Sequence, residues 1–413
     1  RAVYIRYRPL HNGPMRTFQT LFCLLSAAVL LSCTSSDSPS PEAPQPVSIV
    51  TGGEVFGPRF SKGHDDRLVL SWMERGETSA VLRYATLTDE QFTPAREVTT
   101  ESRMFVNWAD LPSVTTLSED HWLAHWLRYS ADKTYSYDVV VAQSFDGGDT
   151  WSEAIPAHTD GTPTEHGFVS VLPDENGALL VWLDGRNTPE SSMTLRSAVI
   201  TPESTRSSEQ EIDNSVCDCC QTDIALAASG PVAVYRDRTR EEIRDIYVSR
   251  RIDGQWQPGT RLFADDWQIA GCPVNGPSII ADGERVTVAW FSAADDKPVV
   301  RAILSSDSGQ SFGDPVEIAT GRIAGYVGLT AVDDHDAVVS WVARNDNGDN
   351  SLRLRRVSAN GTAGPVVDVG ETSQLRVFPQ LAYADGYLYL AWTTSVDGAS
   401  QLRAARLSVG ATT

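Results

Sequence analysis

Leu70-Ser-Trp72 is the first of seven short apolar segments that each close on an aromatic residue. The other six are Ala124-His-Trp126, Leu180-Val-Trp182, Ala233-Val-Tyr235, Val288-Ala-Trp290, Val339-Ser-Trp341 and Leu390-Ala-Trp392. The aromatic residues are 54, 56, 53, 55, 51 and 51 residues apart, and a fixed period of this length is typical of repeat architectures. Each unit contains four short apolar or alternating runs separated by turns. This pattern predicts an all-β, seven-bladed propeller of four-stranded antiparallel blades, with a six-bladed propeller as the alternative if one unit is an excursion.

Closure of the ring requires a strand from the other end of the sequence. The seventh unit shows three strands, at 380–383, 387–393 and 401–407. The segment Pro46-Val-Ser-Ile-Val-Thr-Gly52 is similar to Pro315-Val-Glu-Ile-Ala-Thr-Gly321, which lies between the fifth and sixth units. We therefore expect residues 46–50 to form the outer strand of the last blade and to leave no open edge.

A targeting segment precedes the repeats. Residues 1–32 read as an upstream extension followed by a signal peptide, in which Met15 opens a short basic region and 21–31 is apolar. Leu30-Leu-Ser-Cys33 matches the lipobox of bacterial lipoproteins, so Cys33 is the expected lipidation site. A plain secretory signal with an incidental cysteine is the alternative.

The motif also predicts the domain organisation and the location. We expect a flexible Ser/Pro-rich tether over 33–45 and the propeller domain over 46–413. The predicted partner is a membrane, reached through the N-terminal lipid. Thr34 in place of aspartate after Cys33 favours, by resemblance to other lipoproteins, the outer membrane, with the domain facing the periplasm or the exterior.

The net charge excludes one class of partner. The chain carries a formal charge of -20, and removing residues 1–32 takes away four arginines and no acids, which gives about -24. Such a surface repels nucleic acid, so none is expected as a partner.

Four cysteines remain in the predicted mature chain, and three of them are crowded together. They are Cys217, Cys219, Cys220 and Cys272. Four cysteines in an exported chain suggest two disulfides, whereas the tight C-x-C-C run also fits a thiolate site for Cu(I) or Zn. Aligning Ile224 with Ile279 places Cys217 opposite Cys272 in neighbouring blades, which favours a bond between these two.

Blade topology places the cysteines and the densest polar loops on one face. In a four-stranded meander, the loop before the first strand and the loop between the second and third strands open on the same side. There the sequence brings together arginines suited to carboxylate, phosphate or sulfate, and interleaved acids that could do proton chemistry. A solvated, self-paired loop is the alternative. The candidates that follow an aromatic residue of the repeat are Asp184, Arg186, Arg236, Asp237 and Arg238. His166, which precedes the first strand of its blade, is a further candidate.

Two turns on the opposite face carry a specific motif. Ser144-Phe-Asp146-Gly-Gly148-Asp-Thr-Trp151 fits S-x-D-x-G-x-T-W, and Ser305-Ser-Asp307-Ser-Gly309-Gln-Ser-Phe312 fits it with conservative changes. Here the chain resembles the Asp-box, or bacterial neuraminidase repeat, proteins, whose best-known members are sialidases. The boxes are expected to be structural hairpins, in which Asp bonds backbone amides and Gly takes a positive φ.

The resemblance implies an activity and further candidates. Sialidases hold the substrate carboxylate with three arginines and use a tyrosine nucleophile. Arg59, Arg186, Arg236 and Arg376 could supply the arginines, and Tyr326 precedes a first strand as a nucleophile would. The chain lacks the family's Arg-Ile-Pro segment, and both the seven-fold count and the cysteine run depart from the family.

Three functions follow. The first is a lipid-anchored, sialidase-like propeller that binds a small anionic or glycan ligand on the face of the cysteines and arginines. The second is an exo-sialidase or related glycoside hydrolase, the only enzyme class indicated. The third is a thiolate metal-binding or redox protein.

Overall fold

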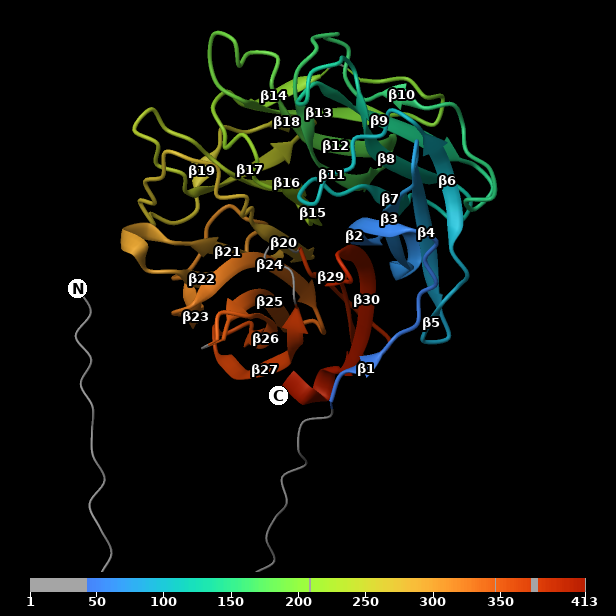
Figure 1. Cartoon of the computed structure of the whole chain (residues 1–413). Coiled ribbons are helices and arrows are strands. Elements are labelled where there is room, and N and C mark those ends of the chain that lie inside the picture. The colour runs from blue at the N-terminus through green and yellow to red at the C-terminus, as the bar shows by residue number, and fades with distance from the viewer. Residues whose placement is uncertain (1–42, 208, 346, 373–377, 413) are drawn as a thin grey trace, which may run out of the picture. The chain divides into compact units, whose positions relative to one another are not determined.

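Seven antiparallel sheets, each of four or five strands, lie around a common axis (Figure 1). The computed structural model describes residues 43–207, 209–345, 347–372 and 378–412. The seven-bladed prediction is confirmed. No helix among these residues is both long and apolar enough to cross a membrane.

The first four blades follow the chain in order. Blade 1 consists of β2 (Glu54–Lys62), β3 (Leu68–Arg75), β4 (Ala80–Thr88), β5 (Gln91–Phe92) and β6 (Arg96–Glu101). Blade 2 consists of β7 (Ser113–Thr116), β8 (Trp122–Tyr129), β9 (Tyr137–Ser144) and β10 (Ile155–Pro156). Blade 3 consists of β11 (His166–Asp174), β12 (Gly177–Asp184), β13 (Thr194–Ile200) and β14 (Gln210–Asp213). Blade 4 consists of β15 (Asp223–Ala227), β16 (Gly230–Arg236), β17 (Ile246–Ile252), β18 (Gln255–Trp256) and β19 (Thr260–Arg261).

The last three blades complete the ring, and the helical segments are single 3-10 turns. Blade 5 consists of β20 (Ser278–Asp282), β21 (Arg285–Ser292), β22 (Val299–Ser305) and β23 (Val316–Thr320). Blade 6 consists of β24 (Ile323–Ala331), β25 (Asp336–Arg344), β26 (Asn350–Ser358) and β27 (Ala363–Thr372). Blade 7 consists of β28 (Gln380–Ala384), β29 (Tyr387–Val396), β30 (Ala399–Ser408) and β1 (Gln45–Pro46). The 3-10 turns are η1 (His64–Asp66), η2 (Ala294–Asp296) and η3 (Val409–Thr412).

Closure by the N-terminal segment is confirmed, but the closing strand is shorter than predicted. Gln45 pairs with Arg406 and Pro46 with Ala405, and the Val47 amide donates to the Ala404 carbonyl at 2.9 Å. The strand is therefore Gln45–Pro46 rather than 46–50. Proline has no amide hydrogen, so this clasp has few backbone hydrogen bonds.

The repeated aromatic residues lie between the sheets. Six are almost completely buried and the seventh, Trp392, is partly buried. Several have a carboxylate acceptor: the Trp72 indole donates to Glu74 at 2.9 Å and the Trp182 indole to Asp184 at 2.8 Å. A buried indole N–H group needs a hydrogen-bond acceptor, so the repeated tryptophans determine the positions of polar residues as well as apolar ones.

The upper face is defined as the side on which the first strand of each blade begins and the second ends. On it, His166 at the start of β11 pairs with Asp184 at the end of β12. The first strands of blades 1, 3 and 6 are bulged near this face, and Phe168 and Tyr326 have φ of 54° and 56°. Bulges re-aim side chains, so these positions shape the upper end of the channel.

Candidate functional site at the upper end of the channel

One residue from each first strand, or from just before it, lines a cavity of about 180 Å³ on the propeller axis. In blade order these residues are Arg59, Asp110, Val169, Asp223, Ser278, Gly328 and Gln380. Each innermost strand packs against the next around the ring, which brings these seven positions together. The cavity is polar and includes three ionisable groups.

Arg59 is the positive charge of this cavity. Its Nη1 donates to the Val169 carbonyl at 2.6 Å, across the channel from blade 1 to blade 3. Within the described part of the chain, this is the one hydrogen bond of the guanidinium, and no carboxylate lies within ion-pair distance of it. Burial lowers the Arg59 pKa, while the charges of Asp223 and Asp110 oppose this shift. Arg59 was predicted as a ligand-binding residue, and the structure places it where a small ligand could reach it.

Two aspartates share the cavity, of which Asp110 is buried and Asp223 is partly buried. Asp110 accepts the Phe168 amide hydrogen at 2.8 Å, and Asp223 accepts the Ile279 amide hydrogen at 2.9 Å. Burial raises the pKa of Asp110 to about 7, and burial also raises that of Asp223. Both carboxyls join neighbouring blades. Neither residue was singled out from the sequence; aligning the residue at the start of each first strand would have shown them.

Three aromatic side chains form a rim beside the cavity. The rings of Trp108 and Phe378 are stacked with centroids 5.5 Å apart, and Tyr326 lies edge-on to Phe378 at 4.8 Å. Trp108 and Phe378 also line a second hollow of about 180 Å³ that includes Phe56 and Pro58. Tyr326 was a candidate nucleophile, and the structure places its ring at the rim, edge-on to Trp108 with 6.3 Å between the ring centroids. An aromatic rim next to a polar cavity suits the apolar face and the polar edge of a sugar ring.

Arg236 is a structural residue by its contacts. Its guanidinium is buried and donates to the carbonyls of Asn275, Arg244 and Phe291 at 2.9, 2.6 and 2.8 Å. It also lies 4.9 Å from the centre of the Trp267 ring. Burial lowers its pKa to about 10. These contacts occupy its three nitrogens, so Arg236 joins blades 4 and 5.

Of the other predicted residues of blade 4, Arg238 is paired with nearby acids and Asp237 is buried. Arg238 lies 2.7 Å from Glu242 and 3.1 Å from Asp218, so its charge is matched on the surface. Asp237 is buried, and burial followed by repulsion from Asp213 raises its pKa to about 7. The self-paired alternative therefore describes this loop.

Arg186, Asp184 and His166 meet at the junction of blades 2 and 3. Arg186 donates to both carboxylate oxygens of Asp184, at 2.8 and 2.6 Å, and pairs with Glu209 at 2.8 Å. His166 is fully buried. Although burial opposes it, the nearby carboxylates, that of Asp160 above all, raise the pKa of His166. Arg376 and Cys33 lie outside the described residues.

The four cysteines form two disulfides, but not in the predicted pairing. Cys217 is bonded to Cys220 and Cys219 to Cys272. The predicted bond between Cys217 and Cys272 is wrong because a tight turn at 218–219 brings Cys217 back to Cys220, with 5.8 Å between their Cα atoms. The second bond still crosses from blade 4 to blade 5, and Cys219 packs against the same buried core as the rim residues Trp108 and Phe378.

The two motif turns have matching hydrogen bonds on the lower face. In the first, Asp146 accepts the Thr150 amide at 2.8 Å and Gly148 has φ of 87°. In the second, Asp307 accepts the Ser311 amide at 2.9 Å and Gly309 has φ of 75°. Hydrogen bonds from Thr150 or Ser311 lower the pKa of each aspartate to about 2. Each motif is therefore a rigid turn between the third and fourth strands.

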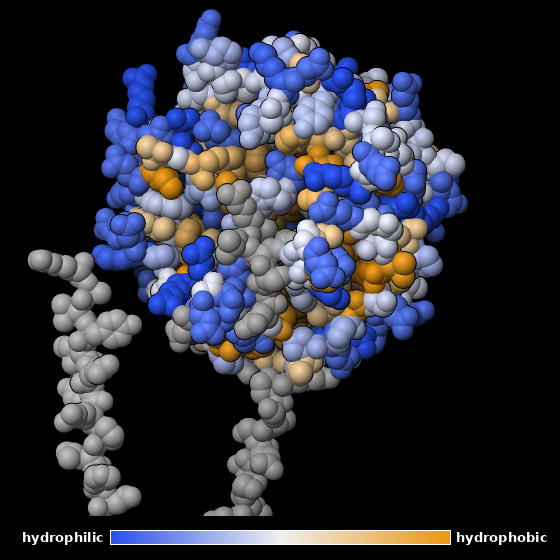
Figure 2. Space-filling model, in the orientation of Figure 1, coloured by the Kyte–Doolittle hydropathy of each residue, from blue (hydrophilic) through white to orange (hydrophobic). Residues whose placement is uncertain are grey.

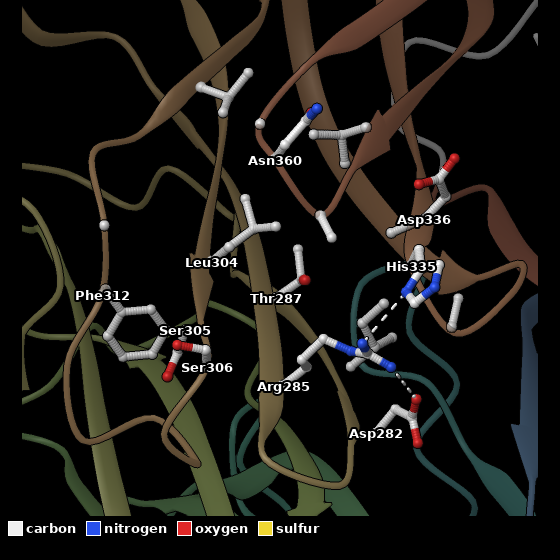
Figure 3. Close-up of a pocket in the computed structure, with 18 of the residues that line it drawn as sticks. Asp282, Arg285, Thr287, Leu304, Ser305, Ser306, Phe312, His335, Asp336 and Asn360 are labelled. Carbon is white, nitrogen blue, oxygen red and sulfur yellow. Dashed lines mark hydrogen bonds and ion pairs between the residues drawn. The ribbon is translucent and has the colours of Figure 1, made fainter.

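A larger hollow of about 680 Å³ lies on the lower face between blades 5 and 6 (Figure 3). In it Arg285 contacts Asp282 at 3.0 Å and His335 at 3.3 Å, and Phe312 of the second motif lies on the opposite wall. Asp282 and His335 are exposed to solvent. Figure 2 shows hydrophilic residues around much of the visible perimeter of the propeller. Because its charges are paired and solvated, we place the candidate site at the channel cavity.

Comparisons with known proteins show the architecture. No family model matches the chain, and no curated protein matches it. Several solved structures do. A PL25 ulvan lyase bound to -[GlcA(1-4)Rha3S]- has a TM-score of 0.52 at 11% identity, over 89% of this chain and 95% of that chain. The α-L-arabinofuranosidase Arb93A from Fusarium graminearum has a TM-score of 0.51 at 12% identity, over 90% and 99%. A protein of unknown function from Dyadobacter fermentans DSM 18053 also scores 0.51, at 14% identity over 90% and 99%.

Proposed function

We propose that this chain binds a short acidic glycan at the upper end of the channel. A sugar carboxylate would pair with Arg59, and a sugar ring would pack against Trp108 and its neighbours on the aromatic rim. The observation that carries the proposal is the Arg59 guanidinium, which lines a polar cavity with a single carbonyl partner and no carboxylate within ion-pair distance in the described chain. A desolvated guanidinium binds a carboxylate through charge-assisted, often bidentate, hydrogen bonds.

The fold supports a glycan ligand without specifying it. Two of the similar propellers are named as a polysaccharide lyase and an arabinofuranosidase, and the sugar bound to the lyase contains glucuronate. In this chain, the corresponding chemistry rests on Arg59 and the rim. The protein's net charge of -20 repels a long polyanion, which would lie close to many of its acids. A short acidic ligand at Arg59 is repelled less, because charges more than about 8 Å away are screened at physiological salt. The lipid anchor at Cys33 and the envelope location remain part of the proposal.

The test is calorimetric titration with short uronate and sialic acid oligosaccharides and with neutral oligosaccharides of equal length. We expect the acidic sugars alone to bind. Arg59→Gln should weaken binding about 10- to 100-fold, since hydrogen bonds to charged groups contribute roughly 1.5–3 kcal/mol. New reducing ends in the same mixtures would assign the hydrolase alternative.

Arg285→Gln is the matched control, because Arg285 lines the lower hollow of Figure 3 and should leave the affinity unchanged. Equal binding of acidic and neutral sugars, or full affinity in Arg59→Gln, would show that Arg59 does not recognise the ligand.

A further inference from the structure

Two histidines and three aspartates form a buried cluster where blades 2 and 3 meet. Asp138 and His158 come from blade 2 and the segment after it, and Asp160 lies in the connection to blade 3. His166 and Asp184 are the cross-strand pair at the upper ends of β11 and β12. His158 and His166 are 3% and 0% exposed, so neither ring is solvated.

The hydrogen bonds of the two rings fix their tautomers. Nδ1 of His166 lies 3.2 Å from the Tyr137 carbonyl, which can only accept, so this nitrogen carries the proton. Nδ1 of His158 lies 2.6 Å from Asp160 Oδ1. In both rings Nε2 is buried and has no hydrogen-bond partner among the described residues. A histidine held at Nδ1 by a carbonyl or a carboxylate, with a bare Nε2, is the usual arrangement of a metal ligand.

Nε2 of His166 faces two carboxylates. It lies 3.3 Å from Asp160 Oδ1 and 3.7 Å from Asp184 Oδ1. Ligands about 2.1 Å from a tetrahedral cation are about 3.4 Å from each other, which matches both distances. The three atoms all lie within 4.8 Å of one another.

Charge balance also calls for a cation. The network joined by ion pairs holds four carboxylates, those of Asp138, Asp160, Asp184 and Glu209, and one guanidinium, that of Arg186. With neutral imidazoles this leaves three unmatched negative charges, and buried charges are costly unless paired. One protonated imidazole would still leave two unmatched negative charges, and two imidazolium rings, stacked at 3.8 Å, would repel each other.

We propose that His166, Asp160 and Asp184 bind a divalent transition-metal cation, Zn²⁺ or Mn²⁺, through one nitrogen and two oxygens. His158 orients Asp160, and Arg186 orients Asp184, from the next layer of contacts. The cation would join blades 2 and 3, much as the disulfide between Cys219 and Cys272 joins blades 4 and 5. Mixed nitrogen and oxygen ligands favour Zn²⁺ and Mn²⁺ over Ca²⁺ and Mg²⁺.

The test is titration of the chelator-treated full-length protein, with disulfides intact, with Zn²⁺, Mn²⁺, Ca²⁺ and Mg²⁺. We expect one Zn²⁺ per chain and a higher melting temperature on binding. Co²⁺ should give the weak ligand-field bands of nitrogen and oxygen ligands, without the intense charge-transfer absorption of thiolates. Asp160→Asn and His166→Asn should abolish stoichiometric binding, and His158→Ala should weaken it about 10- to 100-fold.

His121→Ala is the matched control. His121 lies in blade 2 and bonds Gln143, outside the cluster, so this variant should bind Zn²⁺ like the wild type. The proposal is overturned if the wild-type protein retains no Zn²⁺ or Mn²⁺ and is not stabilised by either. It is equally overturned if Asp160→Asn and His166→Asn still bind one ion per chain. The wild-type measurement decides the question even if a variant fails to fold.

Discussion

Replacing Asp110 by asparagine should stabilise the protein at neutral pH and not at acidic pH. Burial raises the Asp110 pKa from 3.8 to about 7, so the folded protein holds this proton more tightly than the unfolded chain does. Between these two values the unfolded chain releases the proton and the folded protein keeps it. The free energy of unfolding therefore falls as the pH rises through this window, by about 1.4 kcal/mol per pH unit.

Across the whole window, the ionisation of Asp110 lowers the free energy of unfolding by about 4 kcal/mol, and Asp110→Asn removes this loss. Asparagine keeps a side-chain oxygen that can accept the Phe168 amide hydrogen, so little else is lost. We expect equal stabilities near pH 4 and a variant more stable than the wild type by about 4 kcal/mol above pH 7. The attraction of Arg59 for the ionised carboxylate is already contained in the pKa.

The assay is urea unfolding followed by tryptophan fluorescence across this pH range, with the disulfides intact. Asp146→Asn is a control of opposite sign: hydrogen bonds lower the Asp146 pKa to about 2, so its carboxylate is ionised throughout this range, and the variant should be less stable than the wild type by a nearly constant amount. A stability difference for Asp110→Asn that does not change with pH, or a less stable variant above pH 7, would refute the reasoning.

Two further predictions concern stability. Replacing Cys219 and Cys272 together by serine opens a bond that spans 53 residues and should cost about 4 kcal/mol, whereas replacing Cys217 and Cys220, three residues apart, should cost about 2 kcal/mol. The reverse order in denaturant midpoints would contradict the loop-closure argument. Tyr235→Phe removes a buried hydroxyl hydrogen bond of 2.7 Å to a carboxylate and should cost about 1.5–3 kcal/mol by urea unfolding; an unchanged midpoint would mean that the hydroxyl contributes nothing.

The repeat period was sufficient to predict the ring because it reflects a single packing requirement. Each blade must bury a large aromatic residue at the same depth, and a strand of fixed length leads to it. The length of the closing strand was not predictable in this way. The similarity of 46–52 to 315–321 indicated the correct blade, but pairing stops after Pro46 because local backbone geometry, rather than composition, decides where a ladder ends.

The candidate site was predicted less completely, for a different reason. Arginine-rich loops are the usual sequence signal for anion binding, yet Arg236 donates its hydrogen bonds to backbone carbonyls and Arg238 pairs with acids of the fold. Asp110 is a single acid in a loop and Asp223 is the first residue of β15, and only the ring brings them to one axis beside Arg59. His166 was identified as a candidate, but its partners Asp138 and His158 are supplied by the preceding blade and its connection, which no local motif reveals.

The two-residue clasp has a kinetic consequence. A ring sealed by Gln45–Pro46 can open at this seam without disturbing the other six blades, and such local opening is far more frequent than global unfolding. Each opening uncovers the Ala404–Arg406 edge of β30 (Ala399–Ser408), a template on which the N-terminal strand of a second molecule could anneal. The lifetime of the clasp, rather than the stability of the blades, then sets how often this edge is open to a partner strand.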